Sequence, residues 1–315
     1  MDAKTFPTRR TSPAPAEASL DLGSLTLLVL LSLLWGGSFL FMRVAGAEVP
    51  VFTLVLLRVG IAAAALWVVI IASGRRLPSR GGIYLRALLM GFLNNAVPFS
   101  LITFATVEIG AGAASILNAT TPIFTVLIAH RLTADEKMTT NKVAGVVLGF
   151  LGVAVMIGLP ALRGLSADFL AVLAMLAAAT SYGFSAVVGK GFRAIDPVVS
   201  AALQLSASTL LMVPVAFLVD RPFATAMPGM SAIVSILGLA LLSTSLAYVL
   251  FFRIMARAGG TNAMLVTLLV PVSAVTLGVV LLGESLSAGQ FAGMAMIGAG
   301  LVVLDGRALR RLRGG

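Results

Sequence analysis

Hydrophobic residues gather in ten long runs rather than in the narrow stripes of soluble helices. The runs lie at about 24–42, 51–72, 87–107, 109–130, 143–160, 169–189, 198–219, 231–252, 262–283 and 286–304. A helix needs about 20 mainly apolar residues to cross a bilayer, and these runs lack the polar face that a soluble helix shows at 3.6-residue spacing. The pattern predicts an all-α polytopic membrane protein with ten transmembrane helices.

The composition agrees with this prediction and removes most soluble chemistry. Of the 315 residues, 59% are hydrophobic and 11% are charged, and the mean hydropathy is +1.06. Soluble domains are about 45–50% apolar and about 25% charged. The chain has no cysteine and one histidine, which leaves little for disulfides, metal ligation or histidine-based catalysis. We therefore expect no cofactor, no metal site and no enzymatic activity.

The net charge of +10 is a topology signal. With the N-terminus inside, eighteen of the 22 Lys and Arg residues fall in cytoplasmic segments, and the outer loops hold only Arg43, Arg163 and Arg221. Cytoplasmic loops are enriched in Lys and Arg. We therefore expect a multi-pass protein of the plasma (inner) membrane with cytoplasmic tails at 1–22 and 306–315, and no nucleic-acid partner.

The two halves of the chain, 23–160 and 161–305, repeat each other weakly at an offset of 147–149 residues. Residues 35–38 (WGGS) align with 182–185 (YGFS), 118–122 with 267–271, and Glu136 with Glu284. Because each half has five runs, an odd number, the second half must enter the membrane inverted, a recurrent transporter design. The pairs Gly145/Gly149 and Gly289/Gly293 have the spacing of close helix contacts, which we expect within one monomer rather than in a dimer.

Several segments in this order are typical of one family. They are LWGGSF at 34–39, LLR at 56–58, the stretch 111–122 and its echo 260–271, and Gly283-Glu284. The sequence resembles the EamA family of the drug/metabolite transporter superfamily, and within it the YddG-type amino-acid and drug exporters. The resemblance implies a ten-span carrier that works by alternating access, with a cavity lined mainly by spans 1, 3, 4, 6, 8 and 9. At 133–137 the chain reads TADEK, which departs from the usual Gly-Glu pair.

Polar and aromatic side chains inside the runs are the candidate substrate contacts. They are Trp35, Ser38, Asn94, Asn95, Phe99, Asn118, Thr121, Tyr182, Ser243, Thr244, Tyr248 and Thr267. Each of them either lines a cavity or joins helices by packing and interhelical hydrogen bonds. Pro122 and Pro271 remove a backbone donor in runs 4 and 9. They either kink a gating helix or also expose a carbonyl to a substrate ammonium.

Arg58 is the one full charge within a run. It either contacts a substrate carboxylate or extends outward to Glu48 or Glu108, as long basic side chains can. The absence of Asp and Glu from the runs predicts a neutral, partly aromatic cavity. We expect export of small metabolites, either neutral amino acids or amphipathic drugs, with the lipid bilayer as the other partner. The alternatives are a membrane scaffold that does not transport, and an intramembrane enzyme, for which paired catalytic groups are missing.

Overall fold

The computed structural model describes residues 22–79, 81–133, 139–161, 167–192, 194–258 and 266–305. The predicted tails, apart from Leu22, and Glu136 lie outside the described residues. Within the described residues the secondary structure is helical throughout, without strands. Seven helical stretches are long and apolar enough to cross a membrane: Leu22–Ala45, Val51–Ala72, Gly82–Ile109, Ala111–Leu132, Asp168–Phe192, Pro197–Asp220 and Met230–Met255.

Three shorter apolar helices, Thr140–Met156, Leu269–Leu282 and Ala288–Val303, accompany these stretches. The all-α class is confirmed, whereas the count of ten spans and their inverted repeat remain predictions. The main elements in chain order are α1 (Leu22–Ala45), α2 (Val51–Ala72), α3 (Gly82–Met90), η1 (Gly91–Ala96), α4 (Val97–Ile109), α5 (Ala111–Asn118), α6 (Thr121–Leu132), α7 (Thr140–Ala161), α8 (Ala167–Gly189), α9 (Pro197–Val215), η3 (Ala216–Asp220), α10 (Met230–Leu237), η5 (Gly238–Leu246), α11 (Ala247–Ala258), α13 (Val266–Leu282) and α14 (Ala288–Asp305). Short 3-10 turns, η2 (Lys190–Phe192) and η4 (Pro222–Ala224), follow α8 and η3.

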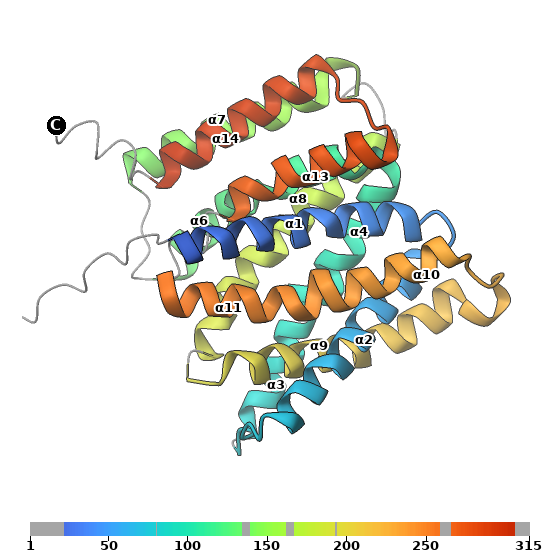
Figure 1. The fold of residues 1–315 in the computed structure, drawn as a ribbon. Coiled ribbons are helices and arrows are strands. Elements are labelled where there is room, and N and C mark those ends of the chain that lie inside the picture. The colour runs from blue at the N-terminus through green and yellow to red at the C-terminus, as the bar shows by residue number, and fades with distance from the viewer. Residues whose placement is uncertain are drawn as a thin grey trace, which may run out of the picture.

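The helices form one bundle in which distant parts of the sequence lie side by side (Figure 1). Helix α1 packs against α13, α2 against α9, and α8 against both α4 and α6. Helices α7 and α14 pack along each other at one edge of the bundle (Figure 1). Helices of the first half therefore alternate with helices of the second half, and neither half forms a compact unit by itself.

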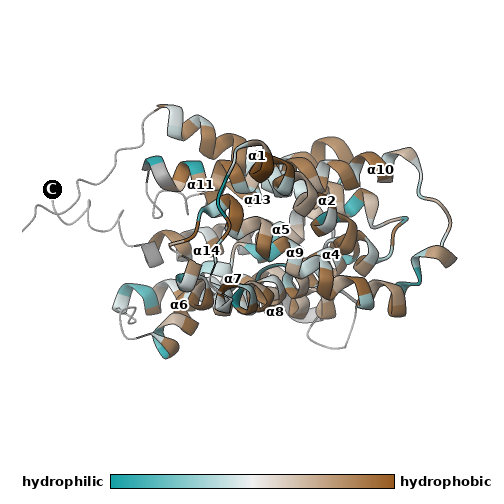
Figure 2. Cartoon of the chain, turned by 90° about the horizontal axis from the view of Figure 1, so that it is seen from below, coloured by the Kyte–Doolittle hydropathy of each residue, from teal (hydrophilic) through white to brown (hydrophobic). Residues whose placement is uncertain are grey.

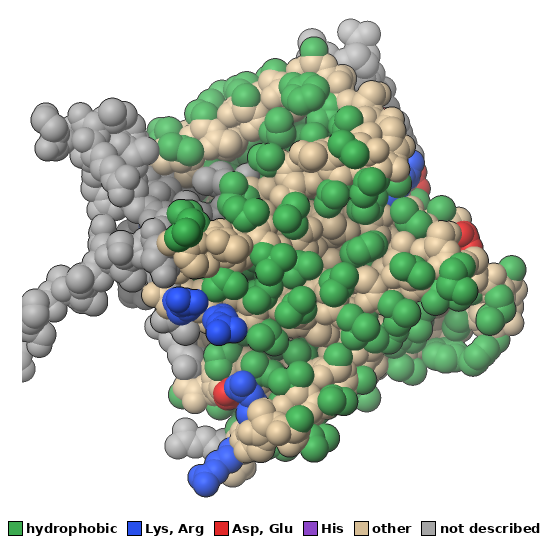
Figure 3. Space-filling model, viewed as in Figure 1, with side chains coloured by type: hydrophobic (Ala, Val, Ile, Leu, Met, Phe, Trp, Pro, Cys, Tyr) green, Lys and Arg blue, Asp and Glu red, His purple; other side chains and the backbone are tan. Residues whose placement is uncertain are grey.

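The outside of the bundle is apolar. Figure 2 shows hydrophobic residues along most of the length of the helices. On the face drawn in Figure 3, hydrophobic side chains cover the middle and charged side chains lie near the helix ends. Leu85, Leu210 and Val280 are more than 70% exposed. A surface this apolar is unfavourable in water and matches the hydrocarbon core of a bilayer.

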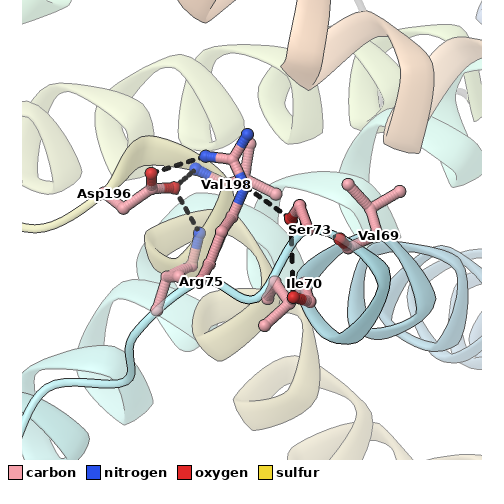
Figure 4. A network of polar contacts seen from close by, with 7 residues as sticks. Val69, Ile70, Ser73, Arg75, Asp196 and Val198 are labelled. Carbon is pink, nitrogen blue, oxygen red and sulfur yellow. Dashed lines mark hydrogen bonds and ion pairs between the residues drawn. The ribbon is translucent and has the colours of Figure 1, made fainter.

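Carboxylates join α2 to α9 at both ends of the pair. At one end Asp196 accepts a hydrogen bond from the backbone N–H of Val198 at 2.9 Å and from Arg75 Nη1 at 2.5 Å (Figure 4). Asp196 therefore caps the first turn of α9, where the free N–H groups and the helix dipole favour an anion. At the other end Asp220 accepts from the backbone N–H of Thr53 at 2.6 Å. These contacts tie α2 to α9 at both ends of the region in which the two helices pack together.

Glycine allows α7 and α14 to approach at backbone distance. A Cβ atom added to Gly293 would lie 2.6 Å from the carbonyl oxygen of Gly152, and one added to Gly300 would lie 2.8 Å from that of Gly145. Both distances are shorter than the contacts that real Cβ atoms make. A side chain at either position would therefore require the two helices to move apart. Gly145, Gly149 and Gly293 of the noted pairs thus take part in helix packing within the chain, and the monomeric state remains a prediction.

The glycine contact yields a matched pair of variants. Gly293→Ala should force α7 and α14 apart and lower the free energy of unfolding by about 1–3 kcal/mol, the usual cost of overpacking. Gly298→Ala is the control because an added Cβ there meets nothing within 4 Å, and alanine favours helix by up to about 1 kcal/mol. Thermal unfolding in detergent measures both. Equal melting temperatures for the two variants would contradict the close contact.

Candidate functional site

Two π-helical segments begin 147 residues apart, which is an offset of the predicted repeat. Segment η1 begins at Gly91 and η5 begins at Gly238, and both interrupt a long apolar helix. Asn94 and Asn95 lie in η1, and Thr244 lies in η5. A π-turn contains more residues than an α-turn, which redirects side chains, and such turns are frequent at functional sites. These three predicted polar residues therefore lie where the backbone departs from α-helical geometry.

A hydrogen-bond network joins three helical stretches in the middle of the bundle. Asn94 Nδ2 donates to Tyr248 Oη at 3.2 Å, and Tyr248 Oη donates to Asn95 Oδ1 at 3.2 Å. Ser185 Oγ donates to Asn94 Oδ1 at 3.0 Å. The structure thus brings three predicted residues into contact. Ser185 was missed, although its alignment with the predicted Ser38 was a signal for it.

Arg58 extends into the bundle and is 6% exposed. Its Nε donates to Thr244 Oγ1 at 3.1 Å, and its Nη1 lies 3.7 Å from the thioether sulfur of Met42. The guanidinium carbon stands 3.6 Å from the centre of the Phe99 ring, a cation–π arrangement. Thr244 lies midway along the stretch formed by α10, η5 and α11, which runs from Met230 to Ala258. The Arg58 side chain therefore contacts the middle of that helical stretch.

Arg58 has no carboxylate partner in the described part of the chain. The ion pair found there joins Arg75 to Asp196. Glu48, one of the two predicted outward partners, instead accepts from the backbone N–H of Gly229 at 2.5 Å. The outward alternative for Arg58 is therefore not the arrangement in this structure, and the buried cation is held by neutral groups alone.

Aromatic rings extend from Trp35 to the polar network. The ring centres of Trp35 and Phe251 are 5.4 Å apart, those of Phe251 and Phe252 are 5.6 Å apart, and those of Phe252 and Tyr248 are 6.1 Å apart. Trp35 is half-buried and its indole N–H has no hydrogen-bond partner among the described residues. The two phenylalanines were absent from the predicted site because nothing distinguishes them in sequence from ordinary core residues.

Equivalent serines make the same local bond in both halves. Ser38 Oγ donates to the Trp35 carbonyl at 2.5 Å. Ser185 Oγ lies 2.8 Å from the Tyr182 carbonyl, so its single proton is shared between that carbonyl and Asn94 Oδ1. Both hydroxyls thus satisfy a backbone acceptor three residues back. The local role of Ser38 is helix structure, whereas Ser185 also holds Asn94.

The fourth long stretch is broken in its middle. Helix α5 ends at Asn118 and α6 begins at Thr121, next to Pro122. The Asn118 carbonyl, which the proline would leave unbonded, accepts from Thr121 Oγ1 at 2.7 Å. The kink is therefore satisfied locally, by a hydroxyl of the same segment. The Asn118 side-chain oxygen is buried and has no partner in the described structure.

The equivalent proline of the second half lies inside an unbroken helix. Pro271 falls within α13, and half-buried Thr267 is near the start of that helix. Pro271, Ile116 and Ala119 line an apolar cavity of about 200 Å³. Pro271 thus faces the segment around the α5–α6 break across an apolar cavity.

A carboxylate at the end of the bundle joins α13 to α5. Glu284 accepts hydrogen bonds from the backbone N–H groups of Ala111 at 2.8 Å and Gly112 at 2.9 Å. It therefore caps the N-terminus of the broken stretch, where an anion is favoured. Gly110 at φ +86° and Gly283 at φ +67° form the turns that bring these segments together. In the sequence, Glu284 was marked as the repeat counterpart of Glu136 and as part of a family motif, and its capping role was not predicted.

A cavity of about 410 Å³ lies beside this cap. Its polar lining includes Arg43, Glu108, Asp168, Glu284 and Gln290. It extends inward to Leu117, the residue before Asn118. The cavity thus leads from the bundle end toward the break between α5 and α6.

Buried polar atoms without partners gather among the candidate residues. In the described structure they are Asn95 Nδ2, Asn118 Oδ1, Ser243 Oγ and Thr53 Oγ1. Buried polar atoms are normally hydrogen-bonded, and each exception calls for an explanation such as a bound solute or water. Three of these four atoms belong to residues that the sequence singled out.

The family profile of EamA-like transporters matches this chain twice, over residues 22–158 and 169–304. The chain belongs to the EamA-like transporter family. The uncharacterized transporter YoaV of Bacillus subtilis is 26% identical over 87% of this chain and 94% of its own length. A probable terminal-alkyne amino-acid exporter of Streptantibioticus cattleyicolor is 29% identical over 91% of this chain and 94% of its own length.

The inner membrane transporter YedA of Escherichia coli K12, itself uncharacterized, is 25% identical over 85% of both chains. A crystal structure of a protein 21% identical to this chain superposes with a TM-score of 0.64, over 90% of this chain and 96% of the other, and shows a shared fold. The resemblance seen in the sequence is confirmed. This EamA-like protein is a multi-pass membrane transporter of small substrates, and these relatives point to transport rather than to enzymatic catalysis.

The Tyr248 network predicts a stability difference between two tyrosines. Tyr248→Phe should lower the free energy of unfolding by about 1–3 kcal/mol, because it leaves buried Asn95 without its hydroxyl partner. Tyr84→Phe is the control, since Tyr84 is 46% exposed and its hydroxyl bonds to the carbonyl of Pro78 at 3.1 Å in an exposed position, where water can replace it. Thermal unfolding of both variants measures the difference. A Tyr248→Phe protein as stable as Tyr84→Phe would show that the network holds nothing together.

Proposed function

We propose that this EamA-like protein is a secondary carrier that exports small metabolites, either neutral amino acids or amphipathic drugs, by alternating access. The observation that carries the proposal is the set of unpartnered polar atoms of Asn95, Asn118 and Ser243 inside an apolar bundle. A polar solute in transit would supply the missing partners. The relative named as a probable terminal-alkyne amino-acid exporter supports the amino-acid class.

The helix contacts support ten spans built as two inverted repeats. Exchanging the first five apolar stretches with the second five turns the α1–α13 contact into the α8–α6 contact, and the α4–α8 contact into the η5–α1 contact. The same exchange turns the α2–α9 contact into α9–α2 and the α7–α14 contact into α14–α7, so each of these two contacts is unchanged. The double match of the family profile points the same way. Such a pseudo-two-fold arrangement gives a carrier two similar end states related by the exchange.

The two alternatives account less well for the site. An intramembrane enzyme needs a nucleophile and base, or paired acids, at one depth, and the network of Asn94, Asn95 and Tyr248 contains no such pair. A scaffold would keep a dry, fully satisfied interior, because unsatisfied polar atoms are costly in lipid. The unpartnered polar atoms are therefore better explained by a solute that binds and dissociates during transport.

The inverted repeat predicts opposite locations for two equivalent loops. Since the chain has no cysteine, single cysteines can be labelled in cells without background. Ser285→Cys, after α13, should react with a membrane-impermeant maleimide in intact cells. Thr133→Cys, after α6, should react only after permeabilisation. Labelling of both from the same side would contradict the inverted topology and the cytoplasmic placement of the termini.

Loss of the central polar and aromatic groups should reduce transport. In liposomes, Asn94→Leu, Asn118→Leu and Trp35→Ala should each lower the initial rate for the neutral amino acid that the native chain moves fastest, by about tenfold or more. One lost hydrogen bond to a solute, about 1.4 kcal/mol, gives that factor. Asn141→Leu, in the peripheral helix α7, is the control.

Retained transport in all three variants would assign the polar layer to helix packing instead of transport. A native chain that moves no member of a panel of neutral amino acids and amphipathic amines would contradict the proposed function itself.

A further inference from the structure

We propose that Arg58 and Asn95 together bind a carboxylate, so that the transported solutes are those that carry a carboxylate group. The inference rests on the proposed function and narrows its substrate class. It assigns the zwitterionic amino acid to the site and excludes cationic amphiphiles that lack a carboxylate.

The first argument is the state of Arg58 itself. A buried charge is costly in a membrane, about 2.5–3.5 kcal/mol at a helix centre on insertion scales. Here it is offset by a hydroxyl at 3.1 Å, a thioether at 3.7 Å and an aromatic face. None of these is an anion. A buried cation held only by neutral groups retains most of its attraction for a carboxylate.

The second argument is the kind of atom left unpartnered. Arg58 Nη2 makes no hydrogen bond with a described residue, and Asn95 Nδ2 is a buried amide donor without a partner. Both are donors. Arg58 belongs to α2, and Asn95 belongs to η1 in the third stretch. The guanidinium stands over the ring of Phe99, which follows Asn95 in that stretch. Asn95 is also bonded to Tyr248, four residues after the Arg58 partner Thr244. A carboxylate only accepts hydrogen bonds, so one carboxylate could accept from both donors.

The third argument concerns the charge of the ligand. The described residues around Arg58 offer one cation, which matches a single negative charge. A phosphate carries up to about two charges and is usually held by several basic groups. An isolated ammonium would be repelled by Arg58.

The test uses the purified full-length chain and matched ligand pairs. Binding of neutral L-amino acids and of their C-terminal amides is measured by thermal shift and calorimetry. The amides keep the side chain and the ammonium and lack the carboxylate. The native chain should bind at least one acid at least tenfold more tightly than its amide. An amide that binds as tightly as its acid would overturn the proposal.

Three variants separate recognition from folding. Arg58→Met should lower affinity for the acid at least tenfold, and Arg58→Lys should restore part of it. Asn95→Asp replaces the proposed amide donor by a carboxylate, which would pair with Arg58 at the proposed site, and it should abolish acid binding while the melting temperature is kept or raised. Arg253→Gln, an exposed change on α11, should leave binding unchanged. If Arg58→Met does not fold, the Asn95→Asp result and the acid–amide comparison still decide the matter.

The remaining outcomes distinguish this inference from the proposed function. Transport of cationic amines that depends on Asn94 and not on Arg58 would overturn the carboxylate site and leave the carrier intact. Competition by millimolar chloride that equals competition by the acid would replace it with a general anion site. A chain that binds and moves none of the panel would overturn both.

Discussion

A polar group inside this bundle has neither water nor lipid to bond with, and that constraint shapes the rest of the structure. Hydroxyls satisfy backbone carbonyls at two places where the helix departs from its regular ladder. Thr121 bonds to the carbonyl of Asn118 at the break of the fourth stretch. Thr244 bonds to the carbonyl of Leu239 within the π-helical segment η5 at 2.8 Å. Irregular backbone is tolerated at depth only when it is repaired in this way.

The same constraint separates the bundle into a packed part and a polar part. Helices α7 and α14 meet through glycine, where backbone contact replaces side-chain chemistry. Helices α2 and α9 are joined at their ends by Asp196 and Asp220. The unpartnered atoms of Asn95 and Ser243 lie instead in η1, which packs against α9, and in η5, which packs against α2. The polar groups that stay available therefore lie in segments other than the glycine-packed pair α7–α14.

Much of the fold could be predicted from sequence because membrane helices must be apolar along their whole length. Hydropathy located the helices, and the mid-run residues Asn94, Asn95 and Tyr248 proved to touch one another. The contribution of Ser185 required knowledge of which helices are neighbours. Hydropathy carries no information on that point, because every helix is apolar on all sides.

Other features depend on local backbone geometry that periodicity does not encode. The π-helical segments around Asn94 and Thr244 change the direction of side chains, and an ordinary helical repeat predicts other directions. The inward course of Arg58 depends on Met42, Phe99 and Thr244 converging from three helical stretches. The cap that Glu284 places on α5 joins residues more than 170 positions apart.

Arg58 also links recognition to movement, because its neutral partner belongs to the other half of the chain. Arg58 is on α2, whereas Thr244 is in η5. A ligand shifts a conformational equilibrium only by its difference in affinity for the two states. The Arg58–Thr244 bond has an ionised donor, and hydrogen bonds of charged groups contribute about 1.5–3 kcal/mol, which corresponds to a factor of about ten or more in an equilibrium constant. A carboxylate that draws Arg58 away from Thr244 would therefore weaken a contact between the two halves, by enough to bias their relative position. Arg58 would then both select the solute and couple its binding to the movement of the helices.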